Sequence, residues 1–275
     1  MKKKHDELIM KIMELSIDAI FIEDTAGDIL MCNKAATEMF GYTKEELIGL
    51  NIKELFPDSQ AKYLKEVYTK DDLCENEYVE RINIKKDKTL FYTEINKKMI
   101  ELDGQEYMIA FVRDMTESRK LREKLNYLAN YDDLTKLRNR REIFRYVHHK
   151  KPPFALAIID VDDFKIINDT YGHYVGDMFL MEIGNLLIEH PDITAGRIGG
   201  EEFLVVIQTK SIRYAYMLMK NILNRAHNKL IEYGGIHFST GIVLHKGNSI
   251  DYDINLADEL CYKVKRGSKD CIAIE

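Results

Sequence analysis

The sequence predicts an α+β protein made of two domains that are joined by a helix. At 275 residues the chain is longer than a typical single domain. Strand-like stretches joined by short turns dominate up to about residue 114, whereas strands alternate with helices from Tyr131 onward. A charged helical stretch without a flexible Gly/Ser-rich segment separates the two patterns. We therefore expect a first domain at 1–114, a helical linker at 115–130 and a second domain at 131–275.

The composition is that of a soluble globular protein and excludes several classes of partner. Hydrophobic residues make up 45% of the chain and charged residues 31%. The net charge of −6 leaves no basic footprint for nucleic acid or an anionic membrane. No apolar run approaches the roughly 20 residues that a membrane-spanning helix needs. The four cysteines form no CxxC pair, which argues against disulfides and zinc. We expect a cytoplasmic protein without membrane insertion.

The first domain is expected to hold an antiparallel sheet with helices on one face. Its strand candidates alternate or cluster apolar residues and are separated by turn-forming residues such as Ala26-Gly27 and Asp103-Gly104. The predicted strands cover 19–23, 28–32, 77–84, 89–99 and 106–113. The predicted helices cover 33–40, 44–48 and, after Pro57, 60–69.

The linker helix begins at Thr116, whose hydroxyl can cap the first turn. Leu121, Leu125 and Leu128 then repeat at spacings of four and three residues, with charged residues between them. Such a stripe is compatible with a short parallel coiled coil against a second copy of the chain. It is equally compatible with a helix that packs on its own domain, and the stripe alone does not separate the two alternatives.

The second domain shows a β-α-β-β-α-β order that fits a ferredoxin-like, palm-type sheet flanked by helices. Its strands are predicted at 154–160, 193–198, 203–208, 236–244 and 271–274. Its helices are predicted at 175–188, 212–232 and 254–264.

Two acidic elements of this domain are candidates for a metal site. The buried strand 154–160 ends in Asp160-Val161-Asp162, and carboxylates at a strand end suit Mg²⁺ together with substrate phosphates. Gly199-Gly200-Glu201-Glu202 forms the tip of a hairpin, where glycines can adopt positive φ. Two adjacent glutamates repel each other, so a nearby cation would account for them. Taken singly, each element is also compatible with an ordinary acidic loop.

Lys165, Asn168, His173 and Asp177 form a third group of candidates. A carboxylate can accept both adjacent N–H donors of a guanine edge, an amide can match the remaining atoms, and a lysine can approach a polyphosphate. The structural alternatives place Asp177 in the first turn of a helix, Asn168 in a turn and His173 in an ordinary hydrogen bond.

In their order along the chain, these motifs resemble the GGDEF family of diguanylate cyclases. The resemblance rests on four segments, DDLTKLRNRR (132–141), DVDDFKIINDTYGHYVGD (160–177), RIGGEEF (197–203) and LADELCYKVKRGSK (256–269). It implies a site in which Asp160, Glu201 and the Val161 carbonyl hold Mg²⁺, with Mn²⁺ as an alternative. It further implies that the nucleotide is bound by Asn168, His173, Asp177, Gly199 and Gly200. Lys165 and Lys265 would face phosphate, and Glu201 or Glu202 would accept the proton of the attacking hydroxyl.

The resemblance implies condensation of two GTP molecules into cyclic di-GMP by two copies that face each other. The alternative is a degenerate domain that binds GTP or a partner protein without turnover. Two departures from the family pattern bear on this choice. The tail Lys265-Arg266-Gly267-Ser268-Lys269-Asp270 exchanges Gly with Ser and replaces an expected Asn by Asp270. No Arg or Lys lies between Asn185 and Gly196, so the family's Arg-x-x-Asp product-inhibition site is not expected.

Residues 18–49 resemble the start of a PAS domain, and Asp114-Met115-Thr116 resembles the end of one. The resemblance implies a sensor that dimerises together with the linker helix, which favours the coiled-coil alternative. No His lies between His5 and His148, so a His-ligated haem in this domain is not expected. The sequence does not indicate which ligand, if any, the domain binds.

Overall fold

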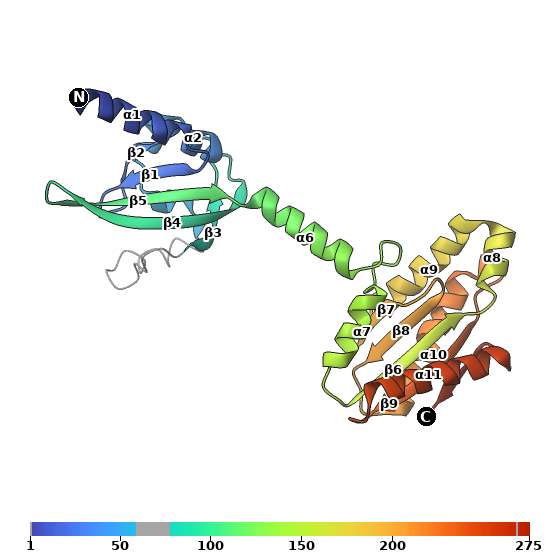
Figure 1. Cartoon of the computed structure of the whole chain (residues 1–275). Coiled ribbons are helices and arrows are strands. Elements are labelled where there is room, and N and C mark those ends of the chain that lie inside the picture. The colour runs from blue at the N-terminus through green and yellow to red at the C-terminus, as the bar shows by residue number, and fades with distance from the viewer. Residues whose placement is uncertain (1, 59–77, 268) are drawn as a thin grey trace. The chain divides into compact units, whose positions relative to one another are not determined.

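The computed structural model describes residues 2–58, 78–267 and 269–275, which form two compact units, Met1–Lys124 and Leu125–Glu275 (Figure 1). Each unit has its own sheet and its own hydrophobic core. The helix predicted at 60–69 lies outside the described residues.

The first unit contains the predicted antiparallel sheet, with strand order β2-β1-β5-β4-β3. Its strands are β1 (Ala19–Glu23), β2 (Ile29–Cys32), β3 (Val79–Ile84), β4 (Leu90–Leu102) and β5 (Gln105–Asp114). Its helices are α1 (Lys2–Leu15), α2 (Lys34–Phe40), α3 (Lys44–Leu47) and the 3-10 turn η1 (Ile52–Leu55). β4 and β5 run longer than predicted because the turn at Asp103-Gly104, with φ of 52° and 79°, keeps them paired to Leu102 and Gln105. α1 was not predicted.

The core of the first unit forms where one face of the sheet meets α2 and α3. Phe21 on β1 packs edge-on against Phe40 at the end of α2, with ring centroids 5.5 Å apart, and Phe40 packs in the same way on Phe91 of β4. The buried Asn33 caps α2 by accepting a hydrogen bond from the Ala36 amide, and it also accepts one from the Ile20 amide. A polar side chain therefore fixes α2 to the sheet.

The linker helix α6 (Thr116–Asn130) has the predicted bounds and buries none of its residues. Leu121 and Leu125 are each 58% exposed and Leu128 is 48% exposed. Packing of this stripe on its own domain, the second alternative from the sequence, is therefore not what the structure shows. The coiled coil with a second copy stays a prediction.

The second unit is built on a five-stranded sheet with strand order β10-β9-β6-β8-β7, as the ferredoxin-like pattern predicted. Its strands are β6 (Phe154–Val161), β7 (Ile193–Arg197), β8 (Glu202–Ile207), β9 (Phe238–His245) and β10 (Cys271–Ile274). Its helices are α7 (Arg140–His149), α8 (Phe164–Tyr171), α9 (His173–Ile188), α10 (Ile212–Lys229), the 3-10 turn η2 (Ile231–Tyr233) and α11 (Ile250–Arg266). The sequence prediction missed α7 and α8 and began α9 two residues late.

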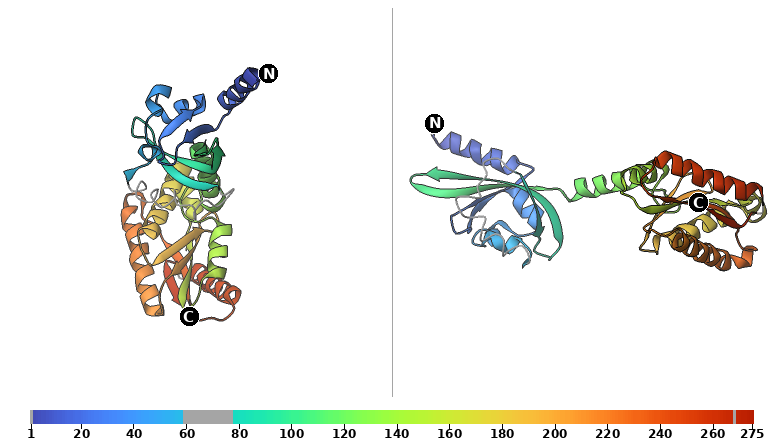
Figure 2. Two further views of the ribbon diagram at one scale, coloured as in Figure 1. Left: turned by 90° about the vertical axis from the view of Figure 1, so that its left-hand side faces the viewer. Right: turned by 90° about the horizontal axis from the view of Figure 1, so that it is seen from below.

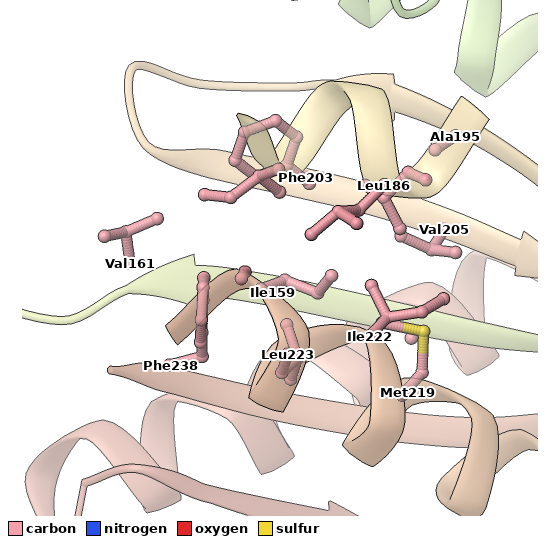
Figure 3. Close-up of a cluster of buried hydrophobic side chains, with 14 of the residues drawn as sticks. Ile159, Val161, Leu186, Ala195, Phe203, Val205, Met219, Ile222, Leu223 and Phe238 are labelled. Carbon is pink, nitrogen blue, oxygen red and sulfur yellow. The ribbon is translucent and has the colours of Figure 1, made fainter. Parts of the chain in front are cut away.

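The central strand β6 is buried along its whole length because helices cover both faces of the sheet (Figures 1 and 2). Ala157 and Ile159 belong to the core that α9 and α10 close, part of which is drawn in Figure 3. Leu156 and Ile158 belong to the core that α7 and α11 close on the other face. The other residues of β6 are apolar core residues, so a polar side chain is found only near the end of the strand, at Asp160.

Candidate active site

Sheet pairing brings the two acidic elements together. Asp160 near the end of β6 lies opposite Glu202 at the start of β8, in an antiparallel register that continues along both strands. The Val161 amide donates a hydrogen bond to the Glu201 carbonyl over 3.1 Å. Asp160 is 7% exposed and Glu201 is partly buried. The main chain itself therefore holds Glu201 beside the end of the central strand.

One ammonium group lies between the two carboxylates. Lys265, in the last turn of α11, places Nζ 2.6 Å from Asp160 Oδ1 and 3.7 Å from Glu201 Oε1. A single cation can therefore reach both side chains. The structure thus brings together three residues that lie in three separate sequence motifs, and it shows where a positive charge sits between them.

The electrostatics of this cluster follow from burial. Burial raises the pKa of Asp160, and Lys265 only partly opposes the shift. Burial together with the charge of Asp160 raises the pKa of Glu201. Burial alone would lower the pKa of Lys265, but its hydrogen bond to Asp160 and the two negative charges raise it. Burial therefore disfavours the charged forms of both carboxylates, and Lys265 offsets only part of this cost.

The donor set fits a magnesium ion that keeps open positions. Asp160, Glu201 and the Val161 carbonyl are hard oxygen donors, the type that Mg²⁺ prefers. Within the described residues, no group of three or more His, Cys, Asp or Glu side chains is arranged to hold a metal by itself. An ion bound here would complete its shell with water and substrate phosphates, as Mg²⁺ commonly does.

Asp162, the second acid of the Asp-Val-Asp sequence, has a structural role. The Ser239 hydroxyl donates to Asp162 Oδ1 over 2.7 Å, and the Asp270 amide donates to Oδ2 over 3.0 Å. Both carboxylate oxygens are therefore engaged, and the side chain is 4% exposed. The residue ties β6 to β9 and to the chain that follows α11.

The glycine pair has a different purpose from the one that the sequence suggested. Neither Gly199 nor Gly200 has a positive φ, so the expectation of a left-handed turn is wrong. A Cβ at Gly199 would instead collide with the Glu202 carboxylate, whereas the described residues leave the corresponding position at Gly200 open. Gly199 makes room for an acidic side chain, and Gly200 leaves the tip of the hairpin accessible.

The remaining candidates lie on α8 and α9. Asn168 on α8 packs against Gly176 on α9, the residue directly before Asp177, because Gly176 has no Cβ to prevent the approach. Lys165, His173 and Asp177 are exposed. α9 begins at His173, so Asp177 lies in the second turn and the alternative of a first-turn acid is wrong. The structure brings Asn168 and the turn that carries Asp177 together, and it gives Lys165 and His173 no hydrogen bond or ion pair among the described residues.

The altered tail is held on the loop that follows β6. The Lys269 ammonium donates to both oxygens of Asp163, over 2.8 and 2.9 Å. Asp270 Oδ2 lies 2.9 Å from His237 Nδ1. An imidazole next to Asp270 explains how this chain accommodates a carboxylate where an amide was expected.

Sequence reasoning missed Arg197 and Asp132. Arg197 donates from Nη2 to the Gly200 carbonyl over 2.7 Å and forms an ion pair with Asp132 at 3.3 Å. Its position two residues before the glycine pair was the available signal, but a single arginine at a strand end has many ordinary explanations.

Comparison with known proteins agrees with both halves of the sequence reading. Residues 129–271 match the family model described as diguanylate cyclase, GGDEF domain, and residues 17–117 match a PAS domain model. The chain is 27% identical to a diguanylate cyclase of Vibrio cholerae, with 91% of this chain and 84% of the relative aligned. It is 28% identical to the probable diguanylate cyclase DgcE of Escherichia coli, aligning over 94% of this chain but only a quarter (25%) of that relative.

Among solved structures, the coiled coil and GGDEF domain of DgcB from Caulobacter crescentus, in complex with c-di-GMP, matches with a TM-score of 0.52 and 25% identity. The match covers 58% of this chain and 94% of DgcB as solved. No helix among the described residues has both the length and the hydrophobicity to span a membrane.

We predict that Gly176→Ala weakens GTP binding. The new Cβ would collide with the Asn168 amide and lie 3.2 Å from the Phe164 ring, which displaces a residue expected to read guanine. We expect about a tenfold loss of GTP affinity, equal to about 1.4 kcal/mol, in calorimetry with Mg²⁺ present. Gly184→Ala on the same helix is the matched control, because its Cβ would meet the Thr135 carbonyl and not Asn168. Equal losses of affinity in both variants would contradict the assignment.

We predict that Glu201→Gln stabilises the metal-free protein. A carboxyl whose pKa is raised by folding makes the protein lose stability as the pH rises from the unfolded pKa through the folded one. Removing that charge should raise the melting temperature at pH 7 by about 1 to 3 °C. At acid pH, where Glu201 is protonated, the two proteins should melt alike. Glu189→Gln, on an exposed ion pair with Arg225, serves as the control. A lower melting temperature at pH 7 would refute the electrostatic argument.

Proposed function

Because this chain belongs to the GGDEF family of diguanylate cyclase domains and carries a PAS domain ahead of it, we propose that it condenses two GTP molecules into cyclic di-GMP. Two pyrophosphates leave in the reaction, one from each GTP. The observation that supports this proposal best is the approach of Asp160 and Glu201 to the same ammonium group, at 2.6 and 3.7 Å. An active cyclase needs both carboxylates to hold one cation. A degenerate domain that only binds the nucleotide does not need this arrangement.

The described residues suit the separate tasks of the reaction. Asp177 and Asn168 are suited to hold the guanine edge. Asp160, Glu201 and the Val161 carbonyl would hold Mg²⁺, or Mn²⁺ in its place. When bound, the ion supplies positive charge that neutralises the triphosphate and favours loss of the hydroxyl proton.

Lys265 and Lys165 face the phosphates in this proposal. Lys265 is held by the two carboxylates in the structure, so it would turn toward phosphate once the metal ion takes over the carboxylate charge. The 3′-hydroxyl of one GTP then attacks the α-phosphorus of the other. Glu201 accepts the proton, with Glu202 as the alternative.

The reaction needs two copies of the chain, because each catalytic domain holds one GTP. We propose a homodimer formed through the PAS domain and α6. The exposed stripe of Leu121, Leu125 and Leu128 supports this assembly, since large apolar side chains at heptad spacing are covered in a parallel coiled coil. The ligand of the PAS domain stays unknown. We place the protein in the cytoplasm, where GTP is available, with no nucleic-acid partner.

The decisive test of the activity is incubation of the purified chain with GTP and Mg²⁺, with the products resolved by chromatography. We expect cyclic di-GMP from the natural chain. Asp160→Ala and Glu201→Ala should each reduce turnover by at least about a thousandfold, because each removes a ligand of the catalytic ion. Both variants should keep the dimer mass in light scattering, and Glu189→Ala should behave as the natural chain does.

Undiminished product from either site variant would contradict the metal assignment. GTP binding by the natural chain in a thermal-shift assay, without product, would instead support the degenerate alternative.

We also predict that the linker stripe controls assembly. Leu121→Glu combined with Leu125→Glu should weaken dimerisation at least about tenfold, because four charges would meet in the apolar seam. The rate per chain should then fall and should rise again with protein concentration. Analytical ultracentrifugation and initial rates measure both effects. Lys120→Ala, which changes the exposed pair with Glu117 on the same helix, is the control. An unchanged dimer in the double variant would remove the linker from the interface.

A further inference from the structure

Two arginine side chains anchor the tip of the catalytic hairpin, one from the hairpin itself and one from α7. Arg197, at the end of β7, donates from Nη2 to the Gly200 carbonyl over 2.7 Å. Arg140, in the first turn of α7, donates from Nη1 to the Ile198 carbonyl over 2.7 Å. Two guanidinium groups therefore hold the main chain on either side of Gly199.

The bond to Gly200 bears directly on Glu201. The Gly200 carbonyl belongs to the peptide plane that also contains the Glu201 amide nitrogen, so fixing that carbonyl fixes the plane from which Glu201 starts. Gly200 has no Cβ and can rotate freely on its own. The Val161 amide fixes the carbonyl side of Glu201, and the bond from Arg197 to Gly200 fixes its amide side.

Arg197 is in turn held by Asp132. The arginine side chain is 17% exposed, and its Nη1 lies 3.3 and 3.4 Å from the two oxygens of Asp132. The Thr135 amide and hydroxyl each donate to Asp132 Oδ1 over 2.8 Å. These hydrogen bonds and the charge of Arg197 outweigh burial and lower the pKa of Asp132, so the carboxylate stays charged at neutral pH.

The backbone around Arg197 reinforces the arrangement. The Arg197 amide donates to the Arg138 carbonyl over 2.9 Å, and the Arg138 amide donates to the Ala195 carbonyl over 3.2 Å. The segment that carries Asp132 is therefore hydrogen-bonded to β7 at Arg138. Arg197 spans from this segment to the hairpin tip with a single planar group, which a lysine cannot imitate.

We propose that Arg197 is a positioning residue for Glu201 and that Asp132 holds Arg197 in the orientation that does so. The inference rests on the proposed function, because Glu201 is the metal ligand and base of that reaction. Misplacement of a reacting group by about 1 Å can cost about a hundredfold in rate. A carbonyl anchor next to Glu201 therefore acts on turnover and not only on stability.

The test uses the full chain with Arg197→Lys, Asp132→Asn and the double variant. Arg197→Lys keeps the charge beside Asp132 but cannot also reach the Gly200 carbonyl. We expect kcat to fall about tenfold while KM for GTP changes less than about twofold. Hydrogen exchange at the amides of residues 199–202 should become faster. The double variant should be no slower than Arg197→Lys, because the two residues act through the same contact. Arg225→Lys, on a remote exposed ion pair, is the matched control.

Two results would overturn the inference. One is a lower melting temperature in Arg197→Lys with unchanged kcat, which a purely structural ion pair would give. The other is a rise in KM with kcat held. Hydrogen exchange keeps the test independent of the proposed function. If the natural chain forms no product, that function fails, whereas unchanged exchange at 199–202 in Arg197→Lys overturns the anchor itself.

Discussion

The antiparallel pairing of β6 with β8 is the constraint on which the catalytic unit depends. It sets Asp160 opposite Glu202 and bonds the Val161 amide to the Glu201 carbonyl. A shift of one residue in this register would turn the Asp160 side chain to the other face of the sheet. The cores on both faces oppose such a shift, because every residue of β6 is buried and each face is packed by its own pair of helices.

The same burial that fixes the register makes the site need a cation. Asp160 lies at the end of a strand with no exposed neighbours, so its charge is poorly solvated and burial raises its pKa. The pKa of Glu201 is raised by its own burial and by the charge of Asp160. Lys265 relieves both residues in the structure, which makes the end of α11 part of the site although it lies more than 60 residues further along the chain. Fold stability and cation binding are thus two consequences of one buried strand end.

Much of this arrangement could be predicted from the sequence, and the failures have physical reasons. The strands of both units could be predicted from apolar runs between turn residues. Asp160 and Glu201 could be predicted as site residues from their positions at strand ends. α7 and α8 were missed because each is short and lies beside a charged motif that reads as a loop. The glycine pair was expected at the hairpin tip, where it lies, but the reason given for it was wrong. A glycine is required at position 199 because the Glu202 side chain occupies the space of a Cβ, and no local sequence pattern encodes that contact. Arg197 and Asp132 lie 65 residues apart, so their pairing exists only in the folded sheet.

The position of that pair gives the linker a direct route to the catalytic hairpin. Asp132 lies two residues after the end of α6, and the Ala129 carbonyl in the last turn of α6 accepts a hydrogen bond from Asn139, the residue that caps α7. The end of the helix, the segment 131–139 and the hairpin tip are therefore joined by consecutive hydrogen bonds. A rotation of α6 would act directly on the segment 131–139, which carries Asp132, because hydrogen bonds join this segment to the end of the helix. Through Arg197, such a movement would reach the peptide next to Glu201 within one copy of the chain, so a change at the linker can alter the site itself as well as how two sites face each other.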